Sequence, residues 1–104
     1  MTYTDYHKTI TEENLKLAKL TNTLFLGQQI EAPSYFYNTL TGIDSKQIRE
    51  MPVAEEMQMG MSLGLALEGY LPISIFQRMD FLLRAADQLV NHLDKIYTMS
   101  RGIF

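Results

Sequence analysis

The stretch IREMPVAEEMQMGMSLGLALEGYLPISIF, residues 48–76, decides the fold of this chain. Its first part, residues 48–53, is a strand-like segment that ends around a proline. Residues 55–68 have the composition of a helix, and Gly69 follows where a C-terminal cap belongs. Residues 72–76 are again rich in strand formers. A strand, a helix and a strand in this order predict two parallel strands joined by a crossover helix.

The flanking segments extend this unit. Residues 4–20 place apolar side chains at helical spacing, and Thr9 with Glu12 suggests a capping box, so one amphipathic helix is predicted. The apolar run at residues 23–26, ended by Gly27, predicts a buried strand. Residues 28–46 show no clear period and predict a loop, although several aromatic side chains in it are expected to pack.

A long final helix is predicted after residue 80, with Asp80 as its cap. Its apolar stripe is expected to consist of Leu82, Ala86, Leu89, Leu93 and Ile96. The predicted fold class is therefore α/β: one domain over residues 1–104 with a small parallel sheet and flanking helices. Because parallel sheets are normally covered on both faces, we expect further chain or a partner to complete the layers.

Composition excludes several classes of function. Hydrophobic residues make up 46% of the 104 residues and charged ones 20%, as in an ordinary soluble domain. The net charge is −3 and the basic residues are scattered, so a nucleic-acid partner is not expected. Neither an apolar run of about 18 residues nor a signal peptide is present, so we expect no membrane partner and a cytoplasmic location. The absence of cysteine excludes disulfides and thiol chemistry.

Few residues stand out as candidates for chemistry. Glu55 and Glu56 lie where the second strand gives way to a helix, the edge of an α/β sheet at which ligands bind. They point about 100° apart on a helix and cannot both enter one small site. Both could equally be first-turn carboxylates favoured by the helix dipole. His7 and His92 have no companion at metal-ligand spacing and are interpreted as surface or core histidines.

Three further sets of side chains lie at helical spacing, and packing explains them at least as well as chemistry does. Small residues four apart allow another backbone to approach closely, methionines fill crowded interfaces, and a polar row is typical of a solvated or partner-facing stripe. The three sets are Gly60 with Gly64; Met57, Met59 and Met61; and Asp87, Asn91 and Lys95.

A dense set of motifs then points to a known family. They are Pro52-Val53-Ala54-Glu55, Gly60, Gly64-Leu65-Ala66, Gly69, Leu71-Pro72-Ile73, Gln77, Asp80-Phe81, Asp87-Gln88, Asn91, Lys95 and Met99-Ser100 with Gly102. In this register the chain resembles the pyrimidine-binding domain of transketolases and 2-oxo acid dehydrogenases. It is most similar to the beta chain of the thiamine-diphosphate-dependent decarboxylating component. The start of the chain resembles the family too, and the likeness is weakest at residues 28–46.

The resemblance implies roles for three residues. In the family, the glutamate at the position of Glu55 hydrogen-bonds a ring nitrogen of the cofactor's aminopyrimidine and so assists deprotonation of the thiazolium carbon. Phe81 would contact the face of the pyrimidine, and Gln28 would also bind the cofactor. The implied cofactor is thiamine diphosphate, with Mg²⁺ bound by a partner chain or domain. The implied partner is an alpha-type chain, in a homo- or hetero-oligomer.

Departures from the family leave alternatives open. Gln28 and Gln29 stand where the family often has two acids, and Ile75 where it has a glutamate. Arg78 and Arg101 also differ from the family pattern. The 104 residues match the N-terminal part of such a domain and lack the Gly-Asp-Gly diphosphate motif, so we expect this chain alone to be inactive. A non-catalytic interaction module with the same fold is the alternative, and an unrelated α/β binding domain is a third possibility.

Overall fold

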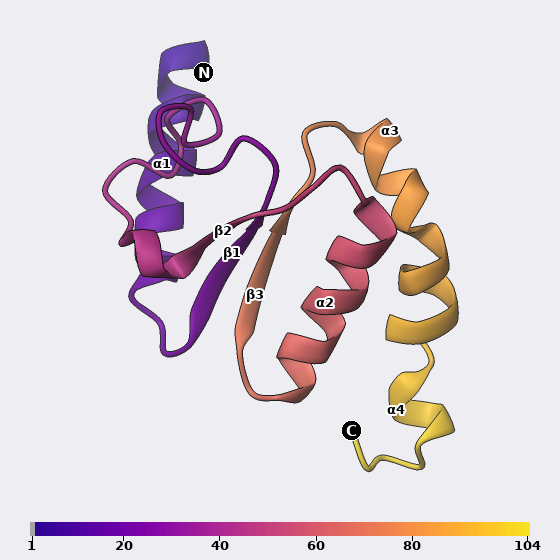
Figure 1. The fold of residues 1–104 in the computed structure, drawn as a ribbon. Helices are drawn as coiled ribbons and strands as arrows, with labels where there is room; N and C mark the ends of the chain where they lie inside the picture. Colours follow the sequence, from indigo (N-terminus) through magenta and orange to yellow (C-terminus); the bar gives the residue numbers. More distant parts are fainter. Residues whose placement is uncertain (1) are drawn as a thin grey trace.

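The computed structural model describes residues 2–104 and shows a three-stranded parallel sheet between helical layers (Figure 1). The strands are β1 (Thr23–Gly27), β2 (Ile48–Glu50) and β3 (Leu71–Ile75), in the spatial order β2-β1-β3. Both pairings of β1 are parallel. The predicted α/β class, a small parallel sheet with flanking helices, is confirmed, although β2 ends three residues earlier than predicted.

Strand β1 is the centre of the sheet and sets where the strands end. In register, its last residue, Gly27, is opposite Glu50 on β2 and Ile75 on β3. The carboxyl ends of all three strands therefore meet at one edge. The chain leaves β1 toward β2 on one side and returns to β3 on the other, which makes this edge a topological switch point, where ligands bind in open α/β sheets.

Helix α1 (Tyr3–Ala18) and the segment 28–46 cover one face of the sheet (Figure 1). The core between them consists of Phe25, Ile30, Leu40, Ile43 and Ile48. Leu15 and Leu17 of α1 pack on this core from outside, and so do Tyr35 and Phe36 of the segment 28–46. The expectation that aromatic side chains of this loop pack is therefore confirmed.

The predicted capping box of α1 is wrong in its position. Thr2 caps the helix: its hydroxyl accepts a hydrogen bond from the backbone N–H of Asp5, whose carboxylate accepts from Thr2 in return. These bonds from Thr2 lower the pKa of the Asp5 carboxyl. Thr9 lies inside the helix and donates its hydroxyl to the carbonyl of Asp5. Two Thr-x-x-acid patterns occur in succession, and the earlier one begins the helix.

The loop between β1 and β2 contains an unusual left-handed turn. The four consecutive residues Tyr35 to Asn38 all have positive φ, between 46° and 63°, which costs L-residues energy. Backbone bonds from Phe36 N to Gln29 O at 2.7 Å and from Leu40 N to Tyr35 O at 3.0 Å tie the turn to its surroundings. Ile30 and Leu40, which precede and follow the turn in the sequence, are buried in the core.

Helix α2 (Glu55–Leu67) covers the other face of the sheet and packs mainly on β3 (Figure 1). Its bounds agree with the prediction to within one residue. The buried residues of α2 are polar: Glu55, Gln58 and Ser62, at spacings of three and four. This polar buried face, rather than an apolar stripe, determines how α2 sits on the sheet.

The predicted long final helix is wrong. The structure has a short helix α3 (Met79–Leu82), a 3-10 turn (Leu83–Ala85), a π-helical segment (Gln88–Leu93) and a last turn, α4 (Ile96–Met99). Asp80 is not the cap but lies in the first turn of α3, 3.1 Å from the guanidinium of Arg78. A π turn holds more residues than an α turn, so the 3.6-residue stripe loses its register. Ala85 is fully buried instead, and Leu93 is exposed.

None of the helices within residues 2–104 is both long and apolar enough to cross a membrane.

A substitution at Gly27 tests the close approach of β1 and β3. A Cβ at this position would lie 2.6 Å from the carbonyl oxygen of Ile75, a backbone atom that cannot move freely. We expect Gly27→Ala to lower the free energy of unfolding by about 1–3 kcal/mol, the usual cost of overpacking. Urea denaturation followed by circular dichroism would measure it.

Gly64→Ala is the matched control. A Cβ at Gly64 has no atom within 4 Å, and alanine is the better helix former, so stability should rise by up to about 1 kcal/mol. A Gly27→Ala variant as stable as the wild type would contradict the close packing at the end of β1.

Candidate functional site

A cleft of about 400 Å³ lies at the carboxyl ends of the three strands. It collects residues that follow β1, β2 and β3 and the first residue of α2. All three residues predicted for the site, Gln28, Glu55 and Phe81, line it. The complete lining consists of Gln28, Gln29, Glu50, Met51, Pro52, Val53, Glu55, Gln77 and Phe81.

Glu55 is the buried acid of this cleft. It is the first residue of α2, only 8% of its surface is exposed, and it lines the cleft. Its carboxylate makes no hydrogen bond or ion pair within residues 2–104, where no fully buried side-chain oxygen or nitrogen lacks a partner, so the carboxylate keeps some exposure. The adjacent Glu56 is exposed and does not line the cleft. The helix thus separates the two neighbouring acids as predicted, and only Glu55 is placed to bind a ligand.

Gln58 holds the start of α2 against the sheet, one helical turn after Glu55. Its side chain is 1% exposed, and its amide nitrogen donates to the carbonyls of Leu26 at 3.3 Å and Ile75 at 3.0 Å. The hydroxyl of Ser74 lies 2.9 Å from the same nitrogen, so the two N–H groups of the amide are shared among three acceptors. One amide therefore joins α2 to β1 and β3 beside their carboxyl ends. Sequence reasoning missed Gln58, and its only signal was a polar residue three positions after Glu55.

Gln28 and Glu50 shape the wall of the cleft at the ends of β1 and β2. The side-chain amide of Gln28 donates to the carbonyl of Pro52 at 2.9 Å, which joins the end of β1 to the segment before α2. The carboxylate of Glu50 accepts hydrogen bonds from the backbone N–H groups of residues 29, 30 and 31. Sequence reasoning missed Glu50, because the predicted strand over residues 48–53 continues past it, whereas β2 ends at this residue.

Phe81 lines the cleft with one face of its ring already covered. The guanidinium carbon of Arg78 lies 4.3 Å from the ring centroid, in the geometry of a cation–π contact. Arg78 also pairs with the carboxylate of Asp80 at 3.1 Å. A ligand that stacks on Phe81 would therefore use the free face of the ring or displace Arg78.

The charge of the cleft limits what it can bind. Its lining includes two carboxylates, Glu50 and Glu55, and three amides, Gln28, Gln29 and Gln77, with no lysine, arginine or histidine. Such a site repels anions and offers hydrogen bonds to a neutral or cationic group. Within residues 2–104, no three His, Asp or Glu side chains are arranged to hold a metal ion.

Comparisons with known proteins find relatives of one kind. The beta subunits of the mitochondrial pyruvate dehydrogenase E1 component of Rattus norvegicus and Homo sapiens are 30% identical to the chain over 82 residues, 75% of its length. The beta subunit of 3-methyl-2-oxobutanoate dehydrogenase of Mycobacterium tuberculosis is 42% identical over 53 residues, 51% of the chain. This chain is a homologue of 2-oxo acid dehydrogenase beta subunits. No protein-family model matches it.

The chain spans only a small part of the length of these relatives. The aligned residues span 23% of the pyruvate dehydrogenase subunits and 15% of the mycobacterial subunit. The homology therefore supports the fold class of the chain.

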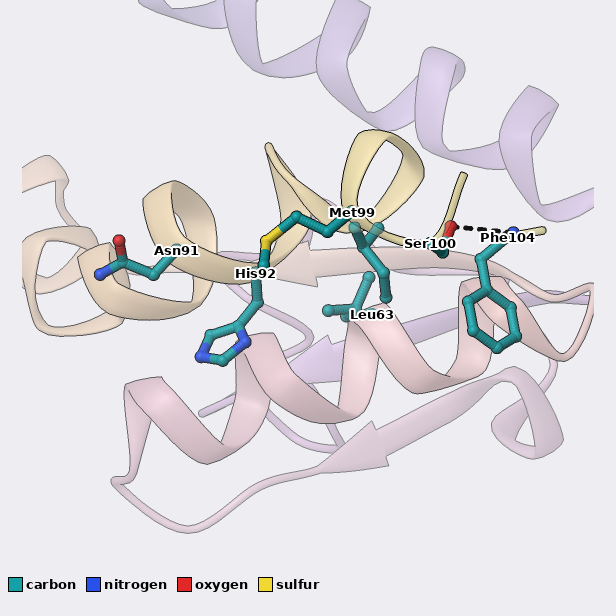
Figure 2. Close-up of a pocket in the computed structure, with 7 residues that line it drawn as sticks. Leu63, Asn91, His92, Met99, Ser100 and Phe104 are labelled. Atoms are coloured by element: carbon teal, nitrogen blue, oxygen red, sulfur yellow. Dashed lines mark hydrogen bonds between the residues drawn. The ribbon is translucent and has the colours of Figure 1, made fainter. Parts of the chain in front are cut away.

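The chain has a second hollow, of about 310 Å³, between α2 and the C-terminal segment. In Figure 2, Leu63 on α2 faces this segment, and His92, Met99 and Phe104 project around the same hollow. None of the residues predicted for the site lines it. The mixture of apolar side chains and one exposed histidine is typical of a contact surface rather than of a reaction site.

The predicted polar row Asp87, Asn91 and Lys95 lies beside this hollow as a chain of hydrogen bonds. Asn91 donates to Asp87 at 2.8 Å, and the ammonium of Lys95 donates to Asn91 at 3.2 Å. The bond from Asn91 is the main cause that lowers the pKa of the Asp87 carboxyl. All three side chains are exposed, in agreement with a solvated or partner-facing stripe.

His7 lies on α1, where its Nε2 is 2.5 Å from the carbonyl oxygen of Tyr37. This contact accounts for its half-buried ring. Neither His7 nor His92 lines the strand-end cleft.

Gln58→Leu tests the link between α2 and the sheet. Leucine has a similar volume but leaves the carbonyls of Leu26 and Ile75 without this donor, so we expect the free energy of unfolding to fall by about 1–3 kcal/mol. Urea denaturation measures the change. Met57→Leu on the exposed face of α2 is the control and should be neutral. Equal stability of Gln58→Leu and the control would show that the amide contributes nothing.

Proposed function

We propose that this chain is the pyrimidine-binding half of a thiamine-diphosphate-dependent enzyme of the 2-oxo acid dehydrogenase type. The observation that carries the proposal is Glu55, a buried carboxylate without a partner in a cleft at the strand ends. The homology to beta subunits of dehydrogenases that act on 2-oxo acids supports the same reaction class.

The lining of the cleft fits the aminopyrimidine end of the cofactor. An aminopyrimidine is flat, uncharged and rich in hydrogen-bonding nitrogens, which suits the carboxylate of Glu55 and the three amides of the lining. Glu55 would hold a proton at a ring nitrogen, Phe81 would stack on the ring, and Gln28 would contact its edge. Met51, Pro52 and Val53 would exclude water from one side. When bound, thiamine diphosphate supplies the carbon nucleophile and the electron sink for decarboxylation.

The diphosphate end of the cofactor needs a different surface. Two carboxylates and no cation would repel a diphosphate, so Mg²⁺ and the residues that bind it are proposed to belong to a partner chain or domain. The relatives are named as beta subunits, which is consistent with an alpha-type partner. By this proposal the chain alone turns over no substrate, and its cytoplasmic location stays a prediction.

The proposed partner surface is the exposed side of α2 together with the C-terminal segment. Met57, Met61 and Leu67 are between 41% and 45% exposed on α2, and Tyr97 and Phe104 are more than 60% exposed nearby. Of the predicted glycine pair, Gly60 already packs near Gln88, whereas Gly64 is open. A second backbone can therefore approach α2 at Gly64, next to the hollow of Figure 2.

The experiment for Glu55 compares two adjacent acids. The chain is co-expressed with an alpha-type partner, cofactor binding is measured by calorimetry with thiamine diphosphate and Mg²⁺, and decarboxylation of a 2-oxo acid is assayed. Glu55→Gln should lower turnover by about 100-fold or more, the usual contribution of a positioned acid. Glu56→Gln, at an exposed position outside the cleft, should behave as the wild type. Unchanged turnover in Glu55→Gln would refute the role of Glu55.

A non-catalytic interaction module is the alternative, and the covered ring of Phe81 favours it. Arg78 occupies the face of that ring, while amides and Ile75 replace the acids that the family often has. This alternative expects no change of melting temperature when thiamine diphosphate and Mg²⁺ are added to the assembled protein. A clear rise in melting temperature would exclude it.

Met61→Lys tests the partner surface. A lysine at this exposed position of α2 would be buried without a counter-ion on association, so we expect the dissociation constant of the assembly to rise by at least about tenfold. Tyr6→Lys introduces the same charge on exposed α1 and should have no effect. Sedimentation velocity over a concentration series distinguishes the two. Equal association of both variants would place the interface elsewhere.

A further inference from the structure

Glu50 lies where the pairing of β1 and β2 stops. It is the last residue of β2 and the register partner of Gly27. One more backbone bond follows, from Met51 N to Gly27 O at 2.7 Å. Beyond it, Gln29 has a positive φ of 58°, so the chain turns out of the strand direction. From this point the backbone of β2 can no longer bind the residues that follow β1.

The carboxylate of Glu50 takes over this task. One oxygen accepts from the N–H of Gln29 at 2.5 Å, and the other accepts from Ile30 at 3.0 Å and Glu31 at 3.2 Å. Three converging N–H groups suit a carboxylate, which only accepts and has lone pairs on both oxygens. Hydrogen bonds to a charged acceptor are also stronger than neutral ones.

Glu31 completes a reciprocal clamp. Its Oε1 accepts a hydrogen bond from the backbone N–H of Glu50 at 3.2 Å. The two acids therefore bind one another's backbone across the ends of β1 and β2. They differ in one respect: Glu50 lines the strand-end cleft and Glu31 does not.

From these contacts we infer that Glu50 is a positioning residue for the proposed site. Its carboxylate holds the backbone of residues 29–31 in place, and Gln28 at the start of this wall then reaches Pro52, three residues before Glu55. The width of the cleft between Gln28 and Glu55 thus depends on a charge that does not itself contact the ring. This inference rests on the proposed function.

The negative charge of Glu50 is essential to its positioning role. A glutamine at position 50 would keep one acceptor oxygen and replace the other by an NH₂ group, which would face at least one of the three N–H donors. Glu50→Gln should therefore release the wall while changing the volume of the side chain little. Glu31→Gln is the matched control, because an amide oxygen can still accept the single bond from the N–H of Glu50.

The test uses ¹⁵N-labelled chain and nuclear magnetic resonance. In Glu50→Gln the amide protons of residues 29–31 should shift upfield and exchange with solvent faster, while the strand amides keep their wild-type protection. Titration with thiamine diphosphate should show an affinity about tenfold lower than that of the wild type, the effect of losing one charge-assisted hydrogen bond. Glu31→Gln should match the wild type in both measurements.

The outcomes separate this inference from the proposed function. A wild-type chain whose cleft amides do not respond to thiamine diphosphate, alone or with its partner, contradicts the proposed function, and with it the role inferred for Glu50. Binding by the wild type with equal binding by Glu50→Gln overturns only the inference. Faster exchange at residues 29–31 without a change of affinity overturns it too, because Glu50 would then stabilise a loop and nothing more.

Discussion

The structure depends on one buried amide. Gln58 is almost completely removed from water, which costs free energy unless its polar atoms are bonded, and its nitrogen donates to β1, to β3 and to the hydroxyl of Ser74. Only one placement of α2 on the sheet brings these acceptors together. Because Glu55 lies one helical turn before Gln58, the same bonds place its carboxylate at the strand ends. A hydrogen bond that specifies packing thus also specifies the candidate site.

Close packing at Gly27 is the second condition for the cleft. The absence of a side chain lets β1 approach Ile75, so the carboxyl end of β3 lies close beside that of β1. Residues that follow all three strands can then line one small cavity. A bulkier residue would separate β3 from β1 at the edge where Gln28, Glu55 and Phe81 meet. The cleft is therefore a result of backbone packing, and the side chains that line it include acids and amides.

Sequence patterns predicted the regular part of the fold and less of the rest. The strands, α1 and α2 follow from local periodicity and turn formers, and the resemblance to a family identified Gln28, Glu55 and Phe81, which the fold brings into one cleft. The prediction of one long C-terminal helix was wrong, because a π-helical segment shifts the apolar stripe of that helix without leaving a signal in the composition. Glu50 and Gln58 were missed because their partners are backbone groups more than fifteen residues away along the chain. Such contacts exist only after the sheet has formed.

On the proposed function, the charges of the cleft account for a site that is divided between two surfaces. A ligand with a hydrogen-bonding ring at one end and a diphosphate at the other requires acids at the first end and cations at the second. Placed side by side in one small cavity, these groups would pair with each other instead of with the ligand. The polar side chains that line the cleft are acids and amides, and Arg78, which contacts the ring of Phe81, is paired with Asp80. In this proposal, separation of the two ends on different chains or domains would keep Glu55 free for the ring.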